Sequence, residues 1–165
     1  IDTNDRVPIG NPTTPEIVYG FGPSFHYKGF DFSFFFQGIA KTSLFMSGLQ
    51  PFGTTMDNKN VQTFIAEDHW SPDNQNIFAK YPRLTIERSA NNATTSTYWE
   101  RDGAFLKLKN AEIGYTFKSM RFYLRGSNLL TFSKFKLWDP EQGGGNGLKY
   151  PTQRVFNIGF QMTIK

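Results

Sequence analysis

Apolar and polar residues alternate with a period of two along two long runs near the middle of the chain. The runs cover residues 105–117 and 120–132, and Lys118-Ser119 separates them. One face collects Ala111, Ile113, Tyr115, Phe117, Phe122 and Leu124, and the other collects Glu112, Thr116, Arg121, Tyr123, Arg125 and Ser127. This period is typical of a strand with one apolar and one polar face. Each run has 13 residues, and a tilted strand crosses a bilayer with roughly 9–11, so the pattern predicts a membrane-spanning hairpin.

Three further strands are predicted over residues 17–27, 30–41 and 152–164. The first contains Pro23, which has no N–H to donate, so we expect a bulge or an unpaired position there. Lys28-Gly29 forms a two-residue turn in which glycine accepts a positive φ. The second strand has Phe at alternate positions on one face, and taken alone this face fits a soluble core as well as a lipid-facing surface: Phe30, Phe32, Phe34 and Phe36.

The run 105–117 changes its apolar parity part-way. Leu106 and Leu108 share one parity, whereas Ala111 and Ile113 share the other. One extra residue in a strand restores a common face, so we predict a β-bulge near Asn110.

Short and long connections alternate along the chain. Two-residue turns at 28–29 and 118–119 alternate with long loops at 42–104 and 133–151, and this asymmetry is typical of outer-membrane barrels. Within the first loop, the spacing of Val61, Phe64, Ile65 and His69 predicts a short helix. We expect it to be capped near Asp57 or Asn58 and to stop before Pro72.

Composition narrows the class of protein. Aromatic residues make up 17% of the chain, yet mean hydropathy is −0.46, and no apolar run approaches the ~20 residues of a membrane helix. Alternating strands have this composition, because lipid-facing and lumen-facing residues cancel in any window. The absence of Cys excludes disulfides and thiolate sites. The net charge of +4 is dispersed, so we expect no nucleic-acid partner.

About five strands are predicted, which is too few for a membrane barrel. The smallest such barrels have 8 strands, and free sheet edges are not tolerated in lipid. The chain starts with polar residues and no Met. We therefore expect it to be a piece of a longer barrel protein.

Several stretches, in order over nearly the whole chain, resemble the C-terminal end of the SusC/RagA family, the TonB-dependent outer-membrane transporters of Bacteroidetes. The matching stretches are Ile9–Pro15, Tyr27–Ser33, Phe36–Gly38, Lys80–Leu84, Trp99–Asn110, Gly114–Thr116, Asn128–Phe132 and Trp138–Glu141, with Pro151 and Arg154 before the last strand.

The resemblance implies an all-β fold of antiparallel up-and-down strands that form the C-terminal part of a large 22-stranded transmembrane β-barrel with long extracellular loops. The plug and the TonB-contacting segment of the family come earlier and are absent from this chain. The implied function is active import of glycans or oligopeptides across the bacterial outer membrane. The implied partners are the rest of the barrel, membrane lipid, TonB and a SusD-like surface lipoprotein that forms a lid. No enzymatic activity and no cofactor are implied.

The lipid-facing positions that we expect on this reading are Phe30, Phe32, Phe34, Phe36, Ile113, Tyr115, Phe117, Phe122, Leu124, Phe156, Ile158, Phe160 and Met162. Tyr27, Phe30, Tyr115, Phe117 and Phe122 lie near the short turns, where an interfacial aromatic girdle is expected. Lys107, Lys109, Arg121 and Arg125 are expected to face the lumen or the outer rim as paired charges of the wall, with guidance of anionic substrates as the alternative.

The loops hold the candidate contacts to substrate or partner, which are Trp70, Trp99, Trp138 and Asp139. Each Trp has a second interpretation, in which its ring packs its own loop. Asp139 and Glu141 are interpreted as solvated or structural carboxylates, with a Ca²⁺ site shared with Asn146 as the alternative. Gly143–Gly147 lacks the Lys-Ser/Thr ending of a phosphate loop, and no nucleophile motif or metal-ligand spacing is present.

Two other functions fit parts of the pattern. A soluble carbohydrate-binding β-domain would bury its Phe faces in a self-contained core. A lipocalin-like barrel would need 8 strands and an apolar interior, which disagrees with the polar faces predicted here.

Overall fold

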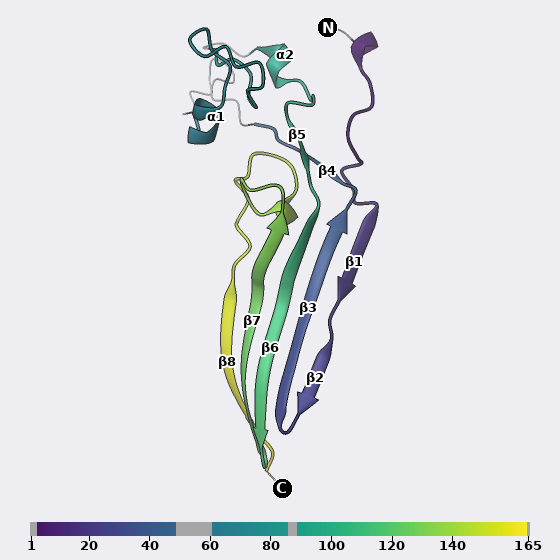
Figure 1. Cartoon of the computed structure of the whole chain (residues 1–165), viewed down its shortest axis with the longest axis vertical. Coiled ribbons are helices and arrows are strands. Elements are labelled where there is room, and N and C mark those ends of the chain that lie inside the picture. The colour runs from purple at the N-terminus through teal and green to yellow at the C-terminus, as the bar shows by residue number, and fades with distance from the viewer. Residues whose placement is uncertain (1–2, 49–60, 86–88, 165) are drawn as a thin grey trace.

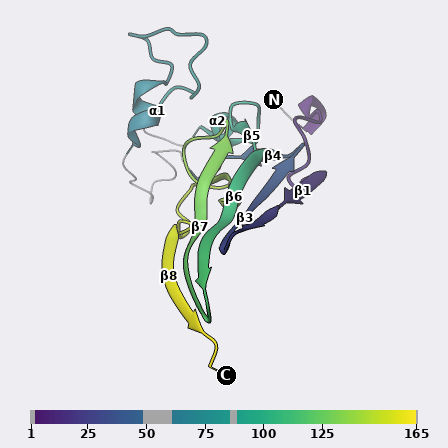
Figure 2. The same ribbon diagram turned by 60° about the horizontal axis from the view of Figure 1, so that its bottom comes forward.

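The computed structural model describes residues 3–48, 61–85 and 89–164, and it consists of a long antiparallel sheet with a compact cluster of loops at one end (Figure 1). We call the sheet the wall and the described residues of 42–104 and 134–151 the head. The strands of the wall are β1 (Ile17–Phe21), β2 (Ser24–Tyr27), β3 (Phe30–Ala40), β6 (Phe105–Phe117), β7 (Met120–Ser133) and β8 (Val155–Met162). Their order is β1-β3-β6-β7-β8, with β2 paired to the first half of β3. The wall is curved along its strands (Figure 2).

The observed strands follow the predicted ranges with two main differences. The predicted strand 17–27 is divided into β1 and β2, because Gly22 and Pro23 leave the ladder. Pro23 cannot donate a hydrogen bond there, although its carbonyl accepts one from the Phe34 N–H at 3.3 Å. The last strand covers Val155–Met162 instead of 152–164, whereas the ends of β3 and β7 differ from the prediction by one residue.

The predicted β-bulge is confirmed. Against β3, the register of β6 shifts between Leu108 and Asn110, so Lys109 is the extra residue of β6. Against β7, the register shifts at the same place in the opposite sense, because Asn128 and Leu129 of β7 lie opposite Lys109 alone. The shift brings Leu108 onto the same face as Ala111, and it also turns the side chains of both Lys107 and Lys109 toward the polar face.

The two short turns have the left-handed backbone that tight hairpins require. Lys28 has φ 47° and Gly29 has φ 86°, and two successive positive values match a type I′ turn. Lys118, at the tip of the β6–β7 hairpin, has φ 53°. Both lysines therefore adopt a conformation that costs a non-glycine residue free energy.

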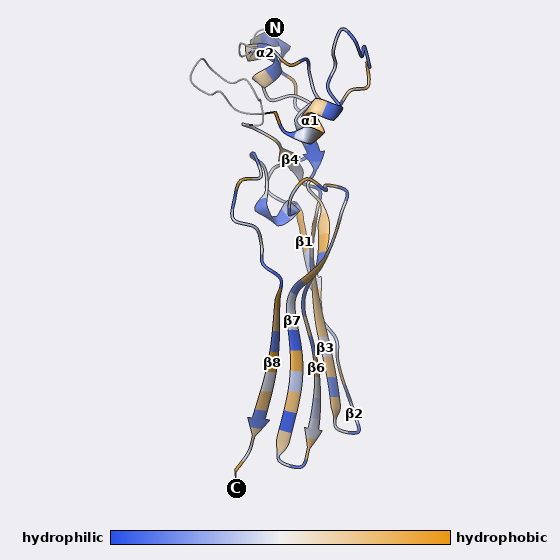
Figure 3. Cartoon of the chain, turned by 90° about the vertical axis from the view of Figure 1, so that its left-hand side faces the viewer, coloured by the Kyte–Doolittle hydropathy of each residue, from blue (hydrophilic) through white to orange (hydrophobic). Residues whose placement is uncertain are grey.

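One face of the wall is continuously apolar, because the register aligns side chains of the same kind across the strands. One row runs through Tyr27, Phe30, Tyr115, Phe122 and Phe160, and the next runs through Phe25, Phe32, Ile113, Leu124 and Ile158. All the positions predicted to face lipid lie on this apolar face. Alternating hydrophilic and hydrophobic bands are visible along β7 and β8 in Figure 3.

Large apolar residues are exposed over most of the wall, whereas the head contains a buried apolar core. Ile158 is 88% exposed and Phe122 is 53% exposed, whereas Ile65 and Trp99 in the head are only 2% and 3% exposed. This head core joins both long loops, since it contains Leu44, Met46, Ile65, Tyr81 and Trp99 from the first and Phe135 from the second. The exposed Phe face contradicts the buried core that a soluble carbohydrate-binding domain requires.

Short elements frame the head. They are η1 (Thr3–Asp5), β4 (Ser43–Phe45), α1 (Thr63–Glu67), α2 (Ala90–Ala93), β5 (Glu100–Asp102) and η2 (Pro140–Gln142), and β4 pairs with β5. The predicted short helix exists as α1, but its N-cap residue is Gln62. The caps expected at Asp57 and Asn58 lie outside the described residues. Among the described residues, no helix has the length and apolar character needed to cross a membrane.

Candidate functional site

An ionic network lies on the polar face of the wall near the short turns. Arg121 donates from Nε to Asp31 Oδ1 at 3.0 Å and from Nη2 to Glu112 Oε1 at 2.6 Å, and it also pairs with Asp31 Oδ2. Asp31 lies opposite Gly114 in the register. A Cβ at Gly114 would lie only 2.6 Å from the Asp31 carboxylate and 2.7 Å from Arg121 Nη2. Glycine therefore lets the network lie flat against the strands.

Tyr123 continues this flat polar surface. The Arg121 guanidinium carbon lies 4.9 Å from the centre of the Tyr123 ring, a distance at which a cation and an aromatic face attract each other. The Tyr123 ring lies over Gly159, where a Cβ would overlap it. Charged and aromatic side chains thus cover the polar face without projecting far from it.

A buried lysine joins the wall to the second long loop. Lys107 on β6 is 1% exposed, and its Nζ donates to Asp139 Oδ2 at 2.6 Å and to Glu141 Oε2 at 2.7 Å. Lys109 also pairs with Glu141. Both lysines reach this loop because residues two apart in a strand share a side, and the bulge places that side on the polar face. We call Lys107, Lys109, Asp139 and Glu141 the latch.

The carboxylates of the latch are held in their charged forms. Burial acts to raise the pKa of Asp139, but the hydrogen bonds from Lys107 Nζ and from the Glu141 N–H outweigh burial and lower it. The pKa of Glu141 is lowered in the same way, with burial opposed by hydrogen bonds from Lys107 and Lys109. Hydrogen bonds and cations near a carboxylate favour its charged form. Lys107 and Lys109 thus bind the carboxylate oxygens of Asp139 and Glu141 that the alternative Ca²⁺ site would use.

The second loop is also tied to the first. Ser47 N–H donates to Gly145 O at 2.9 Å, and Gly145 N–H donates to Phe45 O at 2.9 Å. Phe135 and Trp138 pack edge to face with ring centres 4.6 Å apart. The head is therefore one packed unit built from both long loops, and the latch fixes it to the wall.

The three Trp residues occupy different environments in the head. Trp99 is 3% exposed and donates from Nε1 to Asn92 O at 2.7 Å, so it packs the head core. Trp138 is half-buried, with Nε1 donating to Gly143 O at 3.0 Å, and Trp70 is also half-buried. Trp70, Trp138 and Asp139 stay predictions as contact residues, whereas the structure gives Trp99 the packing role that the sequence offered as its second interpretation.

The wall charges were predicted to be paired, and three of the four are. Lys107, Lys109 and Arg121 bind carboxylates of the chain. Arg125 is exposed and forms no ion pair with the described residues. It lies beside Glu112 in the register between β6 and β7.

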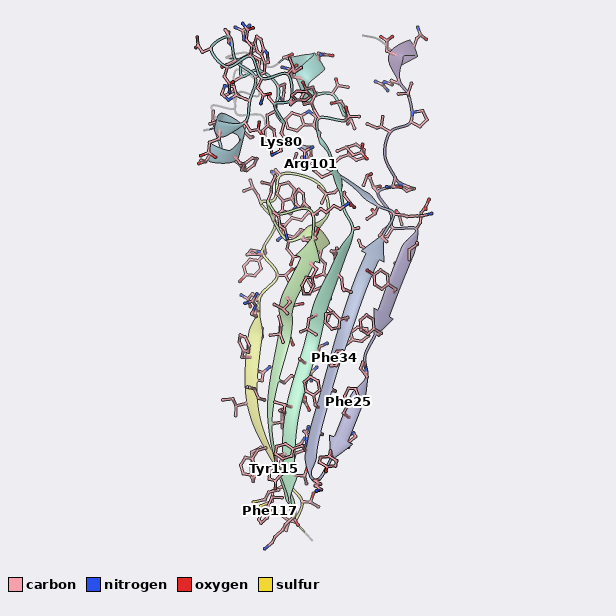
Figure 4. All side chains as sticks on the ribbon, viewed as in Figure 1. Phe25, Phe34, Lys80, Arg101, Tyr115 and Phe117 are labelled. Atoms are coloured by element: carbon pink, nitrogen blue, oxygen red, sulfur yellow. The ribbon has the colours of Figure 1, made fainter. Side chains whose placement is uncertain are left out.

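The head also holds a mixed cavity of about 570 Å³ between α1 and the segment after β7. Lys80 and Arg101 line it together with Tyr81 and Phe135, and Figure 4 shows both cations in the head, far from Tyr115 and Phe117 at the turn end of the wall. Lys80 pairs with Asp68 at 3.2 Å, and Arg101 donates to the carbonyls of Tyr98 and Glu100. Within the described residues, no group of three or more His, Asp or Glu side chains could hold a metal ion.

Comparison with known proteins finds relatives that match nearly the whole chain. No protein-family model matches the chain. The chain is 30% identical over 192 residues to the TonB-dependent receptor P26 of Formosa agariphila, and the match covers 99% of the chain and 18% of that protein. It is 24% identical over 174 residues to the TonB-dependent receptor SusC of Bacteroides thetaiotaomicron, over 98% of the chain and 16% of that protein. Over nearly its whole length the chain is therefore similar to TonB-dependent receptors, SusC among them.

Solved structures have the same fold as this chain. The RagAB peptide transporter aligns with a TM-score of 0.75 at 24% identity, and the match covers 98% of this chain and 19% of the transporter chain. The RagAB peptide importer in its "closed-closed" state aligns with a TM-score of 0.76 at 23% identity. The chain spans about a fifth of the length of the relatives that it matches. The names of these relatives describe receptors and transporters, and none names an enzyme.

The partners in two ion pairs of this chain were not predicted from the sequence. The contact of Lys107 with Asp139 joins residues 32 positions apart, and that of Arg121 with Asp31 joins residues 90 positions apart. The contact between Arg121 and Asp31 could have been predicted, because the two short turns fix the register and place both residues on the polar face near the same end of the sheet. The contact between Lys107 and Asp139 depends on how the irregular second loop folds, which no periodic pattern in the sequence predicts.

Proposed function

We propose that this chain is the C-terminal wall and part of the outer loops of a TonB-dependent transporter that imports oligosaccharides or oligopeptides across the bacterial outer membrane. The observation that carries the proposal is the one-sided exposure of the wall. Its apolar face is exposed over every strand, with Ile158 at 88% and Phe156 at 65%. Water does not stabilise such a surface, whereas the hydrocarbon of a bilayer does.

On this proposal the apolar face contacts lipid and the polar face lines the interior of the complete barrel. The row of Tyr27, Phe30, Tyr115, Phe122 and Phe160 lies close to the short turns, where interfacial aromatic residues are expected. The free edges at β1 and β8 pair with the rest of the barrel, because unpaired strand edges are not tolerated in lipid. A plug and a TonB-contacting segment belong to the rest of the protein.

The head lies outside the cell on this proposal, where it contacts a SusD-like surface lipoprotein. Its packed core gives the two long loops a fixed shape, and the latch fixes that shape to the wall. A rigid rim suits a partner that opens and closes over it, since preorganised surfaces lose less entropy on binding.

Uptake by whole cells tests the proposed function. Cells that carry the full-length gene are supplied with fluorescent oligosaccharide and oligopeptide pools, beside cells from which the gene is deleted. We expect gene-dependent uptake of one pool, and we expect a protonophore to abolish it because import depends on the proton gradient. Uptake of neither pool, or uptake that resists the protonophore, would contradict the proposal. A native polypeptide of only 18.9 kDa that stays folded and soluble without detergent would also contradict it.

A further inference from the structure

Three irregularities of the wall meet at one level of the sheet. Gly22 and Pro23 interrupt the edge strand, Lys109 is an extra residue of β6 against β3, and Asn128 and Leu129 of β7 lie opposite Lys109 alone. Phe35 pairs with Asn110, and Asn110 pairs with Ser127, so these breaks lie side by side across the strands. Bulges and glycines in strands often accompany a binding site, because they re-aim side chains or let another group approach closely.

A cavity of about 320 Å³ opens on the polar face at this level. Its lining includes Ser24, Ser33, Phe35, Asn110, Glu112 and Arg125, drawn from β2, β3, β6 and β7. The volume is at the small end of the roughly 300–1,000 Å³ range of ligand pockets, so it fits one ring-sized unit of a longer ligand. Gly22 and Phe34 also line it, and none of the loop residues predicted to contact substrate or partner does.

Phe35 provides an aromatic platform in this cavity. It is the one Phe of β3 with polar-face parity, and it is 40% exposed. Its ring lies against the backbone of the edge strand, since a Cβ at Gly20 would lie 3.0 Å from Phe35 Cζ and one at Gly22 would lie 2.8 Å from Phe35 Cδ2. Two glycines therefore let an aromatic ring lie flat on a polar surface, where it is available to stack on a ligand.

The polar groups around Phe35 offer hydrogen-bond donors and acceptors with no net charge. Glu112 and Arg125 are register partners with opposite charges, and Ser24 and Ser33 are register partners that carry hydroxyls. Asn110 Oδ1 accepts from Ser127 Oγ at 3.1 Å, which leaves the amide N–H groups of Asn110 as donors. The negative charge of Glu112 would repel an anionic ligand that approached Arg125. A ligand with adjacent hydroxyl groups can instead accept a hydrogen bond from the Arg125 guanidinium and donate one to the Glu112 carboxylate.

We propose that this cavity binds a pyranose unit of an oligosaccharide, with the C–H face of the sugar on Phe35 and its hydroxyls on Arg125, Glu112 and Asn110. The partly positive hydrogens of a sugar face are attracted to the negative face of an aromatic ring. The proposal rests on the proposed function of import and names its substrate class, in favour of oligosaccharides over peptides.

Binding to arrays tests the site without requiring transport. The purified full-length transporter, labelled in detergent, is applied to an array of neutral and acidic oligosaccharides and to an array of peptides. We expect it to bind neutral oligosaccharides, and we expect Phe35→Ala to weaken that binding roughly tenfold or more, as removal of a stacking ring does elsewhere. Phe35→Tyr keeps the ring and is expected to retain binding within about threefold of the unchanged protein.

A matched control separates stacking from folding. Phe32→Ala removes the same side chain from the apolar face of the same strand and is expected to leave binding unchanged. Binding confined to peptides or to acidic sugars, binding to neither array, or equal loss in Phe35→Ala and Phe32→Ala would each overturn the proposal. Because the arrays measure equilibrium binding and need no TonB, their failure leaves the uptake experiment standing, and failure of uptake leaves the array result interpretable.

Discussion

The wall and the head of this chain distribute their apolar residues in opposite ways. In the wall, large apolar side chains are exposed on one face while charged groups on the other face pair with one another. In the head, apolar side chains form a buried core across two loops. Apolar surface avoids water in both cases. The difference therefore indicates different surroundings, with the head stabilised by its own packing and the wall dependent on a lipid environment and on neighbouring strands.

The comparison also explains where each region can be changed. A core residue of the head has fixed neighbours, so its removal leaves a cavity. On the proposed function, a residue of the apolar face has lipid as its neighbour, so truncation costs little whereas a charge costs much. The following predictions use the full-length protein in lipid or detergent, and they run from the largest expected effect to the smallest.

Trp99→Ala should destabilise the head by about 3–5 kcal/mol, because it removes a buried aromatic side chain and the hydrogen bond to Asn92 O. Hydrogen exchange followed by mass spectrometry should show faster exchange in residues 61–85 and 89–102 and no change in β7. The neighbouring Tyr98 is 48% exposed, so Tyr98→Ala is the control and should change stability by less than about 0.5 kcal/mol. Equal effects of the two substitutions would show that the head lacks its own core.

Ile158→Lys should destabilise the barrel by about 2–4 kcal/mol, since it places a charge on the face assigned to lipid. Unfolding by denaturant in lipid vesicles measures this cost. Asn157 is the adjacent residue on the polar face, so Asn157→Lys is the matched control, with an expected cost below about 1 kcal/mol. If Asn157→Lys were the more costly change, the two faces would be assigned the wrong way round.

Lys107→Met should loosen the second loop by about 2 kcal/mol. The substitution leaves Asp139 and Glu141 without this partner, and the full cost of breaking a buried pair is reduced because both carboxylates are partly exposed, at 19% and 33%. Hydrogen exchange in residues 134–142 should then rise roughly 30-fold. Lys109→Met removes a lysine that is 20% exposed and should have a smaller effect, below about 1 kcal/mol. Unchanged exchange in Lys107→Met would show that the latch does not hold the loop.

The latch should also weaken in acid. The pKa values of Asp139 and Glu141 are lowered from their usual values of 3.8 and 4.5, so the stabilisation is complete above about pH 5 and is lost as the pH falls through the lowered values. Exchange in residues 134–142, corrected for its intrinsic pH dependence, should accelerate below about pH 4. The pH dependence should disappear in Lys107→Met combined with Lys109→Met. If the pH dependence of exchange persisted in that double variant, it would arise from titratable groups outside the latch.

Lys28→Asn should stabilise the hairpin of β2 and β3 by about 0.5–1 kcal/mol, the smallest of these effects. Lys28 has a positive φ of 47°, and Asn adopts that conformation at lower cost than Lys. The midpoint of denaturant unfolding should rise, whereas Lys80→Asn in the head, as a control for lost charge, should not raise it. A fall in the midpoint would show that Lys28 stabilises the turn by a contact instead.

The sequence alone was sufficient to predict most of the wall. A period of two and two-residue turns determine both which face a side chain occupies and which residues pair, so the bulge at Lys109 and the apolar face follow from the spacing. The head could not be predicted in this way. Its core joins residues from Leu44 to Phe135 through irregular backbone, and neither the latch nor the burial of Trp99 has a periodic signal. In the sequence, Phe35 differs from its neighbours only as an apolar residue at a polar-face position. The position of its ring depends on Gly20 and Gly22, which belong to the edge of the sheet.

The assignment of the apolar face to lipid is tested most directly by spin labels placed one at a time along residues 30–37 of the full-length protein in a bilayer. This chain contains no Cys, so a single introduced Cys can carry each label here. We predict that accessibility to oxygen, which concentrates in lipid, is highest at Phe30, Phe32, Phe34 and Phe36. Accessibility to a water-soluble nickel complex should instead be highest at Asp31, Ser33, Phe35 and Gln37. A flat profile, or the opposite alternation, would contradict the account.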